Sequence, residues 1–82
     1  MQTIWAYPAS FTEQDGEVVV RFPDLPEVLT AAATMAEARL LAADALEEAI
    51  LGYWAAGRAI PTPRAPTGAE EVVGVRLDGP VG

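Results

Sequence analysis

The sequence contains no cysteine, no histidine and no lysine, and each absence excludes a class of function. Without cysteine there is no thiol catalysis and no disulfide framework, so the chain fits a reducing compartment. Without histidine and cysteine there is no Ser-His-Asp triad, no imidazole acid–base chemistry and no structural zinc site. The five basic residues are all arginines, and against twelve acidic residues they leave a net charge of −7. This charge opposes binding to a phosphate backbone and suits a basic protein partner.

The chain of 82 residues is long enough for one domain, and we expect a single domain over residues 1–82. Its 51% hydrophobic residues are sufficient for a folded core, although a core this small favours self-association as a supplement. No apolar run approaches the ~20 residues of a membrane span, and the N-terminus lacks the layout of a signal peptide. We therefore expect a cytoplasmic protein that does not contact a membrane.

Residues 2–22 predict a β-hairpin. Residues 2–12 (QTIWAYPASFT) mix β-branched and aromatic residues, and 17–22 (EVVVRF) are typical of a second strand. Asp15-Gly16 between them is a strong hairpin turn signal, because glycine adopts a positive φ without steric cost. The side of the first strand that carries the aromatic residues is the expected core face. Pro8 cannot donate to a sheet ladder, so we expect an edge or a bulge there.

The hairpin is followed by a predicted corner and a short strand. Two prolines bracket Asp24-Leu25 within 23–26, and this predicts a rigid, extended corner that ends the second strand. Residues 27–31 (EVLTA) can then form a short third strand.

A single amphipathic helix is predicted from Met35 to about Ala56, because apolar residues recur there at helical spacing. Thr34 is followed three residues later by Glu37, which is the spacing of a capping box. Gly57 suits the left-handed position after the helix.

The remainder predicts a connector and a last strand. Residues 57–68 carry three prolines and favour an extended connector, residues 70–77 read as a strand, and Asp78-Gly79-Pro80 ends it. The order is strand, strand, strand, helix, strand. We therefore predict an α+β fold with a three-stranded antiparallel sheet, a fourth strand, and one long helix on one face.

Several short runs in this order form a recognisable series. They are Tyr7-Pro8-Ala9, Asp15-Gly16, Phe22-Pro23-Asp24-Leu25-Pro26, Thr30 and Thr34 with Glu37-Ala38, and Gly57-Arg58-Ala59-Ile60-Pro61-Thr62-Pro63. Over about residues 5–63 the series resembles the HicB antitoxin family, specifically its N-terminal toxin-binding domain. The resemblance implies a partial ribonuclease-H-like fold of order β-β-β-α-β, which agrees with the order read above.

The resemblance also implies a function. HicB-like proteins bind and neutralise HicA, a small basic toxin that cleaves messenger RNA, so we expect an antitoxin that masks the RNA site of the toxin. Such a protein is not an enzyme and needs no cofactor or metal. Full-length members usually add a C-terminal DNA-binding module, which we do not find in residues 1–82. Repression of its own operon through such a missing part is the alternative function, and we expect no direct nucleic-acid binding by this chain alone.

The candidate toxin-binding residues are Asp15, Asp24, Leu25 and Glu27. Asp24 could face the toxin or cap its own turn. Leu25 could contact the partner or fold back onto the core. Glu27 stands where the family usually has glycine; it could add charge beside Asp24 for a basic partner, or be an ordinary solvated glutamate.

Three residues of the helix are candidates for an oligomer contact. Leu40 and Leu51 lie outside the main apolar stripe, and Trp54 lies near the helix end. We therefore expect a homodimer or homotetramer. A small enzyme with a carboxylate–metal site is a third hypothesis, but nothing in the spacing of the acidic residues forces them to converge.

Overall fold

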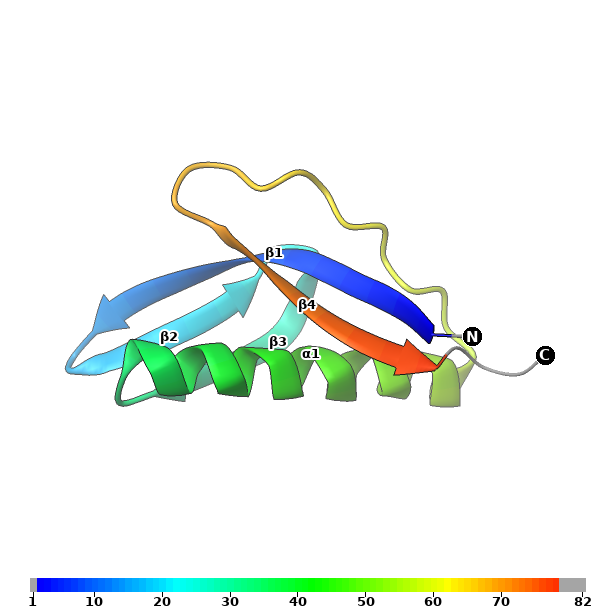
Figure 1. Ribbon diagram of the computed structural model, residues 1–82, viewed down its shortest axis with the longest axis horizontal. Coiled ribbons are helices and arrows are strands. Elements are labelled where there is room, and N and C mark those ends of the chain that lie inside the picture. The colour runs from blue at the N-terminus through cyan, green and yellow to red at the C-terminus, as the bar shows by residue number, and fades with distance from the viewer. Residues whose placement is uncertain (1, 79–82) are drawn as a thin grey trace.

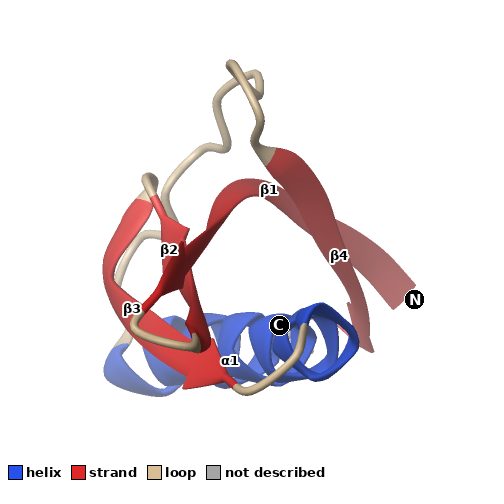
Figure 2. Ribbon diagram, turned by 90° about the vertical axis from the view of Figure 1, so that its left-hand side faces the viewer, coloured by secondary structure: helices blue, strands red, loops and turns tan. Residues whose placement is uncertain are grey.

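The computed structural model describes residues 2–78 and shows an α+β fold (Figure 1). The four strands form one antiparallel sheet in the order β3-β2-β1-β4, and the helix α1 lies across one face of it (Figure 2). Both the predicted class and the predicted order are confirmed. The predicted strand end at Gly79-Pro80 lies outside the described residues. The elements are β1 (Gln2–Gln14), β2 (Glu17–Phe22), β3 (Leu25–Ala32), α1 (Met35–Ala56) and β4 (Glu71–Asp78).

The β1–β2 hairpin closes through the two-residue turn that the sequence predicted. Asp15 and Gly16 both have positive φ angles, 51° and 80°, and Gln14 pairs with Glu17 on either side of them. Two consecutive positive φ angles characterise the type I′ turn, whose twist matches that of the flanking strands. The turn therefore fixes the register of the hairpin.

β1 is one of the two inner strands of the sheet, and it changes its partner in the middle. Residues 2–9 pair with β4, whereas residues 10–14 pair with β2. Pro8 lies in the first part, opposite Val72, so only β4 is paired with the strand at this position. Proline cannot donate to a ladder, and the expectation of an edge at Pro8 is therefore met locally, although β1 as a whole is not an edge strand. Figure 2 shows the result, a sheet that curls over α1.

β3 begins earlier than the sequence predicted. Phe22 pairs with Leu25, whereas the preceding residue, Arg21, pairs with Leu29. The pairing therefore shifts register between Arg21 and Phe22, and residues 26–28 of β3 have no partner in this register. The turn is therefore confined to Pro23 and Asp24, and Leu25 already belongs to β3. Pro26 is tolerated within the strand because β3 lies at the edge of the sheet.

Both ends of α1 are the predicted ones. The Thr34 hydroxyl accepts a hydrogen bond from the Glu37 N–H (3.2 Å), and the Glu37 carboxylate accepts one from the Ala33 N–H (3.4 Å). At the other end Gly57 has a φ of 66°, and its N–H donates to the carbonyl of Trp54 (3.1 Å). The capping residues thus satisfy backbone groups that the helix itself leaves unpaired.

The core lies between the curled sheet and α1. The helix contributes the stripe Ala38, Ala42, Leu46, Ile50 and Tyr53, and β1 contributes Tyr7 and Ala9 from the predicted face. Trp5, also on that face, is half-buried and meets the ring of Trp54 edge-on, with ring centroids 5.8 Å apart and planes inclined at 74°. The remaining buried hydrophobic residues are Val18, Val20, Phe22, Leu25, Ala32 and Leu77.

The proline-rich connector has no helix or strand from 58 to 70, and it leads from the end of α1 back to the start of β4 (Figure 1). Its anchor in the core is Tyr7, whose hydroxyl donates to the carbonyl of Pro61 (2.6 Å). Burial raises the pKa of Tyr7, and the charge of Asp24 raises it further, so the donating neutral form is favoured.

We expect Tyr7→Phe to lower the free energy of unfolding by about 1 kcal/mol, because it leaves the Pro61 carbonyl without its donor. Urea denaturation measures the loss, and amide hydrogen exchange should accelerate at Arg64, whose N–H in the connector donates to Asp24. Tyr53→Phe is the matched control, since its hydroxyl binds a carboxylate that water can solvate. Unchanged stability and unchanged exchange in Tyr7→Phe would show that this hydrogen bond does not hold the connector.

Candidate functional site

The four residues predicted to face a toxin do not form one cluster. Asp15 lies in the β1–β2 turn, whereas Asp24, Leu25 and Glu27 lie at the other end of β2. β2 has six residues, so its two ends are roughly 17 Å apart. The structure therefore brings three of the candidates to one corner of the sheet and leaves Asp15 at the hairpin tip.

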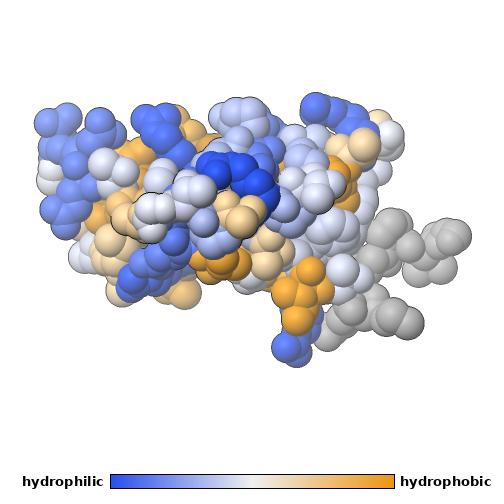
Figure 3. All heavy atoms as spheres, turned by 90° about the horizontal axis from the view of Figure 1, so that it is seen from above, coloured by the Kyte–Doolittle hydropathy of each residue, from blue (hydrophilic) through white to orange (hydrophobic). Residues whose placement is uncertain are grey.

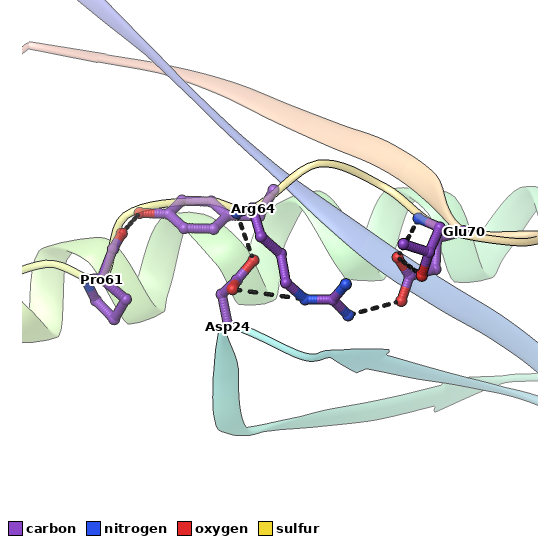
Figure 4. A network of polar contacts seen from close by, with 6 residues as sticks. Asp24, Pro61, Arg64 and Glu70 are labelled. Carbon is purple, nitrogen blue, oxygen red and sulfur yellow. Dashed lines mark hydrogen bonds and ion pairs between the residues drawn. The ribbon is translucent and has the colours of Figure 1, made fainter.

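Two of the corner residues have structural roles. Leu25 is completely buried and belongs to the core, which is one of the two alternatives that the sequence left open. Asp24 is half-buried and accepts a hydrogen bond from the backbone N–H of Arg64 (3.2 Å), with the Arg64 Nε 3.8 Å from its other oxygen (Figure 4). A toxin contact by either residue stays a prediction.

Arg64 continues this network along the connector. Its guanidinium donates to Glu70 (3.1 Å), and the other oxygen of Glu70 accepts from the Thr67 N–H (2.9 Å), as Figure 4 shows. The Thr67 hydrogen bond and the charge of Arg64 hold the pKa of Glu70 below its ordinary value. The network ties the β2–β3 corner to the start of β4 through residues that lie 40 positions apart. No local sequence signal joins Asp24 to Arg64.

Glu27 forms a second cluster with the C-terminal end of α1. The Tyr53 hydroxyl donates to Oε1 of Glu27, and this hydrogen bond is the main cause of the lowered pKa of Glu27 and of the raised pKa of Tyr53. The guanidinium carbon of Arg58 lies 4.7 Å from the centre of the Tyr53 ring, in cation–π geometry. These three residues and two small residues of the helix, Ala49 and Gly52, line a hollow on the surface. We call it the Gly52 hollow.

The charges of the protein lie at its surface, because no charged or polar residue is buried among those with described burial. Several arginines are engaged within the chain: Arg64 in the connector network, Arg58 on Tyr53, and Arg39 in a two-pronged ion pair with Glu71 (2.9 and 3.1 Å). Figure 3 shows hydrophilic side chains gathered at the hairpin end of the molecule. The exposed acids of that hairpin are Glu13, Asp15 and Glu17.

The three candidates for an oligomer contact differ in exposure. Leu40 and Leu51 are 70% and 46% exposed, and their spacing of eleven residues places them on one face of α1. Trp54 is half-buried and packs on Trp5 within the chain. The homodimer or homotetramer stays a prediction.

The described part of the chain contains neither a cluster of metal ligands nor a membrane-spanning helix. Within 2–78 no group of three or more acidic side chains is arranged to hold a metal ion. Over the same residues, the helix is not long and apolar enough to cross a membrane.

Gly52 occupies a helix position that would accept a larger residue. A Cβ built there meets no atom within 4 Å. Glycine in a helix interior is about 1 kcal/mol less favourable than alanine, so we expect Gly52→Ala to raise the free energy of unfolding by about 1 kcal/mol. Chemical denaturation measures this. A destabilised variant would mean that the glycine is required by the fold.

We expect acid to destabilise the fold through Glu27, Glu70 and Glu71, whose pKa values hydrogen bonds hold below the ordinary value of 4.5. A carboxylate with a lowered folded pKa contributes stability above its unfolded pKa, and this contribution disappears as the pH falls through the folded pKa. The melting temperature should therefore fall between pH 5 and pH 3, and less steeply when the three are changed to glutamine.

The matched control replaces the exposed glutamates Glu13, Glu47 and Glu48 by glutamine. This variant has the same change in net charge but keeps the three hydrogen-bonded carboxylates. Equal acid sensitivity in the two variants would contradict the assignment.

The comparisons with known proteins identify the family of the chain. Residues 6–77 match the family described as the HicB-like antitoxin of bacterial toxin–antitoxin systems. The chain is also 44% identical over 57 residues to the antitoxin HicB 2 of Photorhabdus laumondii, a match that covers 70% of this chain and 41% of that relative. The family that the sequence predicted is thereby confirmed, whereas the ribonuclease-H-like label stays a prediction. The chain belongs to the HicB-like antitoxin family.

Proposed function

We propose that this chain binds a small basic HicA-type toxin and neutralises it by covering the surface with which the toxin holds messenger RNA. Membership of the antitoxin family supports the general function. The observation that carries the mechanism is the net charge of −7, borne at the surface of a domain that buries none of its described charged side chains.

The physical basis of the mechanism is competition for a cationic surface. A protein that cleaves RNA must attract a phosphate backbone, and it does so with clustered positive charge. An acidic protein of complementary shape binds that same surface and excludes the RNA from it. Long-range attraction accelerates the encounter, and local contacts then determine how long the complex lasts.

The predicted toxin-binding residues contribute unequally to this proposal. Asp15 and Glu27 are exposed and available to a partner. Leu25 is buried and Asp24 is engaged by Arg64, so we assign them the positioning of the corner on which Glu27 lies. The exposed acids of the hairpin tip then act at long range, and Glu27 acts at short range.

The test uses a purified HicA-type toxin. We expect RNA cleavage to fall to background as the chain is added to the toxin, and a complex to appear in size-exclusion chromatography. Because the attraction is electrostatic, raising the salt concentration should slow association. Undiminished cleavage together with the absence of a complex would refute the proposal.

A charge-neutral hairpin variant separates steering from contact. Glu13→Gln, Asp15→Asn and Glu17→Gln together remove three exposed acids without touching the core. We expect association to slow about tenfold at low salt and to approach the wild-type rate at high salt. The matched control compares two single changes, Glu17→Gln at the hairpin and Glu47→Gln at an exposed position of α1; an equal effect would show that only net charge matters.

A further inference from the structure

Gly52 has no explanation inside the chain. It lies within α1, where glycine is unfavourable, and its φ is not in the left-handed region that favours glycine. No neighbouring atom would clash with a side chain there, because none lies within 4 Å of the position that a Cβ would occupy. What the glycine does is leave the floor of the Gly52 hollow open, together with Ala49.

The walls of the Gly52 hollow are held in place by contacts within the chain. Tyr53 is buried, and its hydroxyl donates to Glu27 from β3. Gly57 turns the chain at the end of the helix, so that the Arg58 N–H donates to the Tyr53 carbonyl (2.9 Å) while the Arg58 side chain covers the Tyr53 ring. A hollow with fixed walls binds without a large ordering cost.

The chemistry of the hollow suits a long cationic side chain. Its floor is apolar, and Glu27 on its wall is exposed, with Oε1 oriented by the Tyr53 hydroxyl. The same hydrogen bond lowers the pKa of Glu27 and keeps the carboxylate ionised. Lysine and arginine combine an apolar stem with a charged end, which matches this arrangement.

The charges around the hollow favour the same occupant. Arg58 is the cation on its wall and faces Tyr53 and Glu27. The negative charges near it are Glu27 and two exposed acids of α1, Glu48 and Asp44. These two lie about one and two turns before Gly52 on the same side of the helix. The local balance is therefore negative, as it is for the whole chain.

We propose that the Gly52 hollow receives a lysine or arginine side chain of the toxin, with the stem over Ala49 and Gly52 and the charged end on Glu27. The inference rests on the proposed function, since the toxin supplies the side chain. It assigns Gly52 to binding: the glycine lowers helix stability, and a bulky side chain at its position would project into the hollow.

The decisive variant is Gly52→Leu, tested by titration calorimetry with the same HicA-type toxin. We expect its affinity to fall at least about tenfold, while its melting temperature stays equal to or above that of the wild type. A merely structural role would move stability and affinity in the same direction. Ala36→Leu adds the same side chain to an exposed position about 24 Å away along α1, and it should bind within about twofold of the wild type.

Glu27→Gln tests the charge of the occupant. It removes the anion and keeps an acceptor for Tyr53, so the hollow should survive. We expect about tenfold weaker binding at low salt and a smaller loss at high salt, because a charge interaction is screened. A loss that is independent of salt would contradict a cationic occupant.

The outcomes separate this inference from the proposed function. If the wild type binds the toxin and Gly52→Leu binds it equally well, the inference is wrong and the proposed function stands. If Gly52→Leu alters only the oligomeric state measured by sedimentation, the hollow serves a second copy of the chain, and the inference is again wrong. If the wild type does not bind the toxin, both fall.

Discussion

The constraint on which the rest of the structure depends is the proline in β1, one of the two inner strands of the sheet. Pro8 cannot take part in a ladder on both sides, and β1 pairs with β4 up to Ala9 and with β2 from Ser10 onward. A strand with one partner at a time lets the sheet curl over α1 (Figure 2). The proline-rich connector runs back over this curled sheet, and Tyr7, next to Pro8, holds it through Pro61. The residue without an N–H thus lies where β1 has a single partner, next to the tyrosine that binds the connector.

The connector in turn determines where the charged groups lie. Its contacts join the β2–β3 corner to the start of β4. In these contacts Arg64 forms ion pairs with Asp24 and Glu70. Arg39 and Arg58 are also engaged within the chain. Exposed ion pairs of this kind add little stability, but they fix side chains and leave the unpaired acids to set the surface potential. Because these contacts engage arginines within the chain, the exposed unpaired acids dominate the surface potential.

Local patterns were sufficient for the fold, and they failed where residues meet across the chain. The hairpin turn and both ends of α1 follow from chemistry within four residues, such as Asp15-Gly16 and the Thr34–Glu37 cap, and the structure has them where they were expected. The early start of β3 depends on a register shift opposite Arg21, which no turn signal encodes. The clusters of the candidate site join Glu27 to Tyr53 and Asp24 to Arg64, 26 and 40 positions apart. Neither pairing is marked by a periodicity or a motif in the sequence. Only the folded chain reveals the partner of each of these two acids.

The contrast between Leu25 and Glu27 shows how one corner serves two purposes. Leu25 is drawn fully into the core by its pairing with Phe22, and this fixes the path of the next residues. Two positions later, Glu27 is exposed beside the end of α1, where Tyr53 orients its carboxylate. A domain of 82 residues has a thin stability margin, so unfavourable features such as a glycine within a helix are tolerated only in small number. Gly52 lies beside Glu27, which is exposed and is oriented by Tyr53. We therefore look for the role of Gly52 in binding a partner.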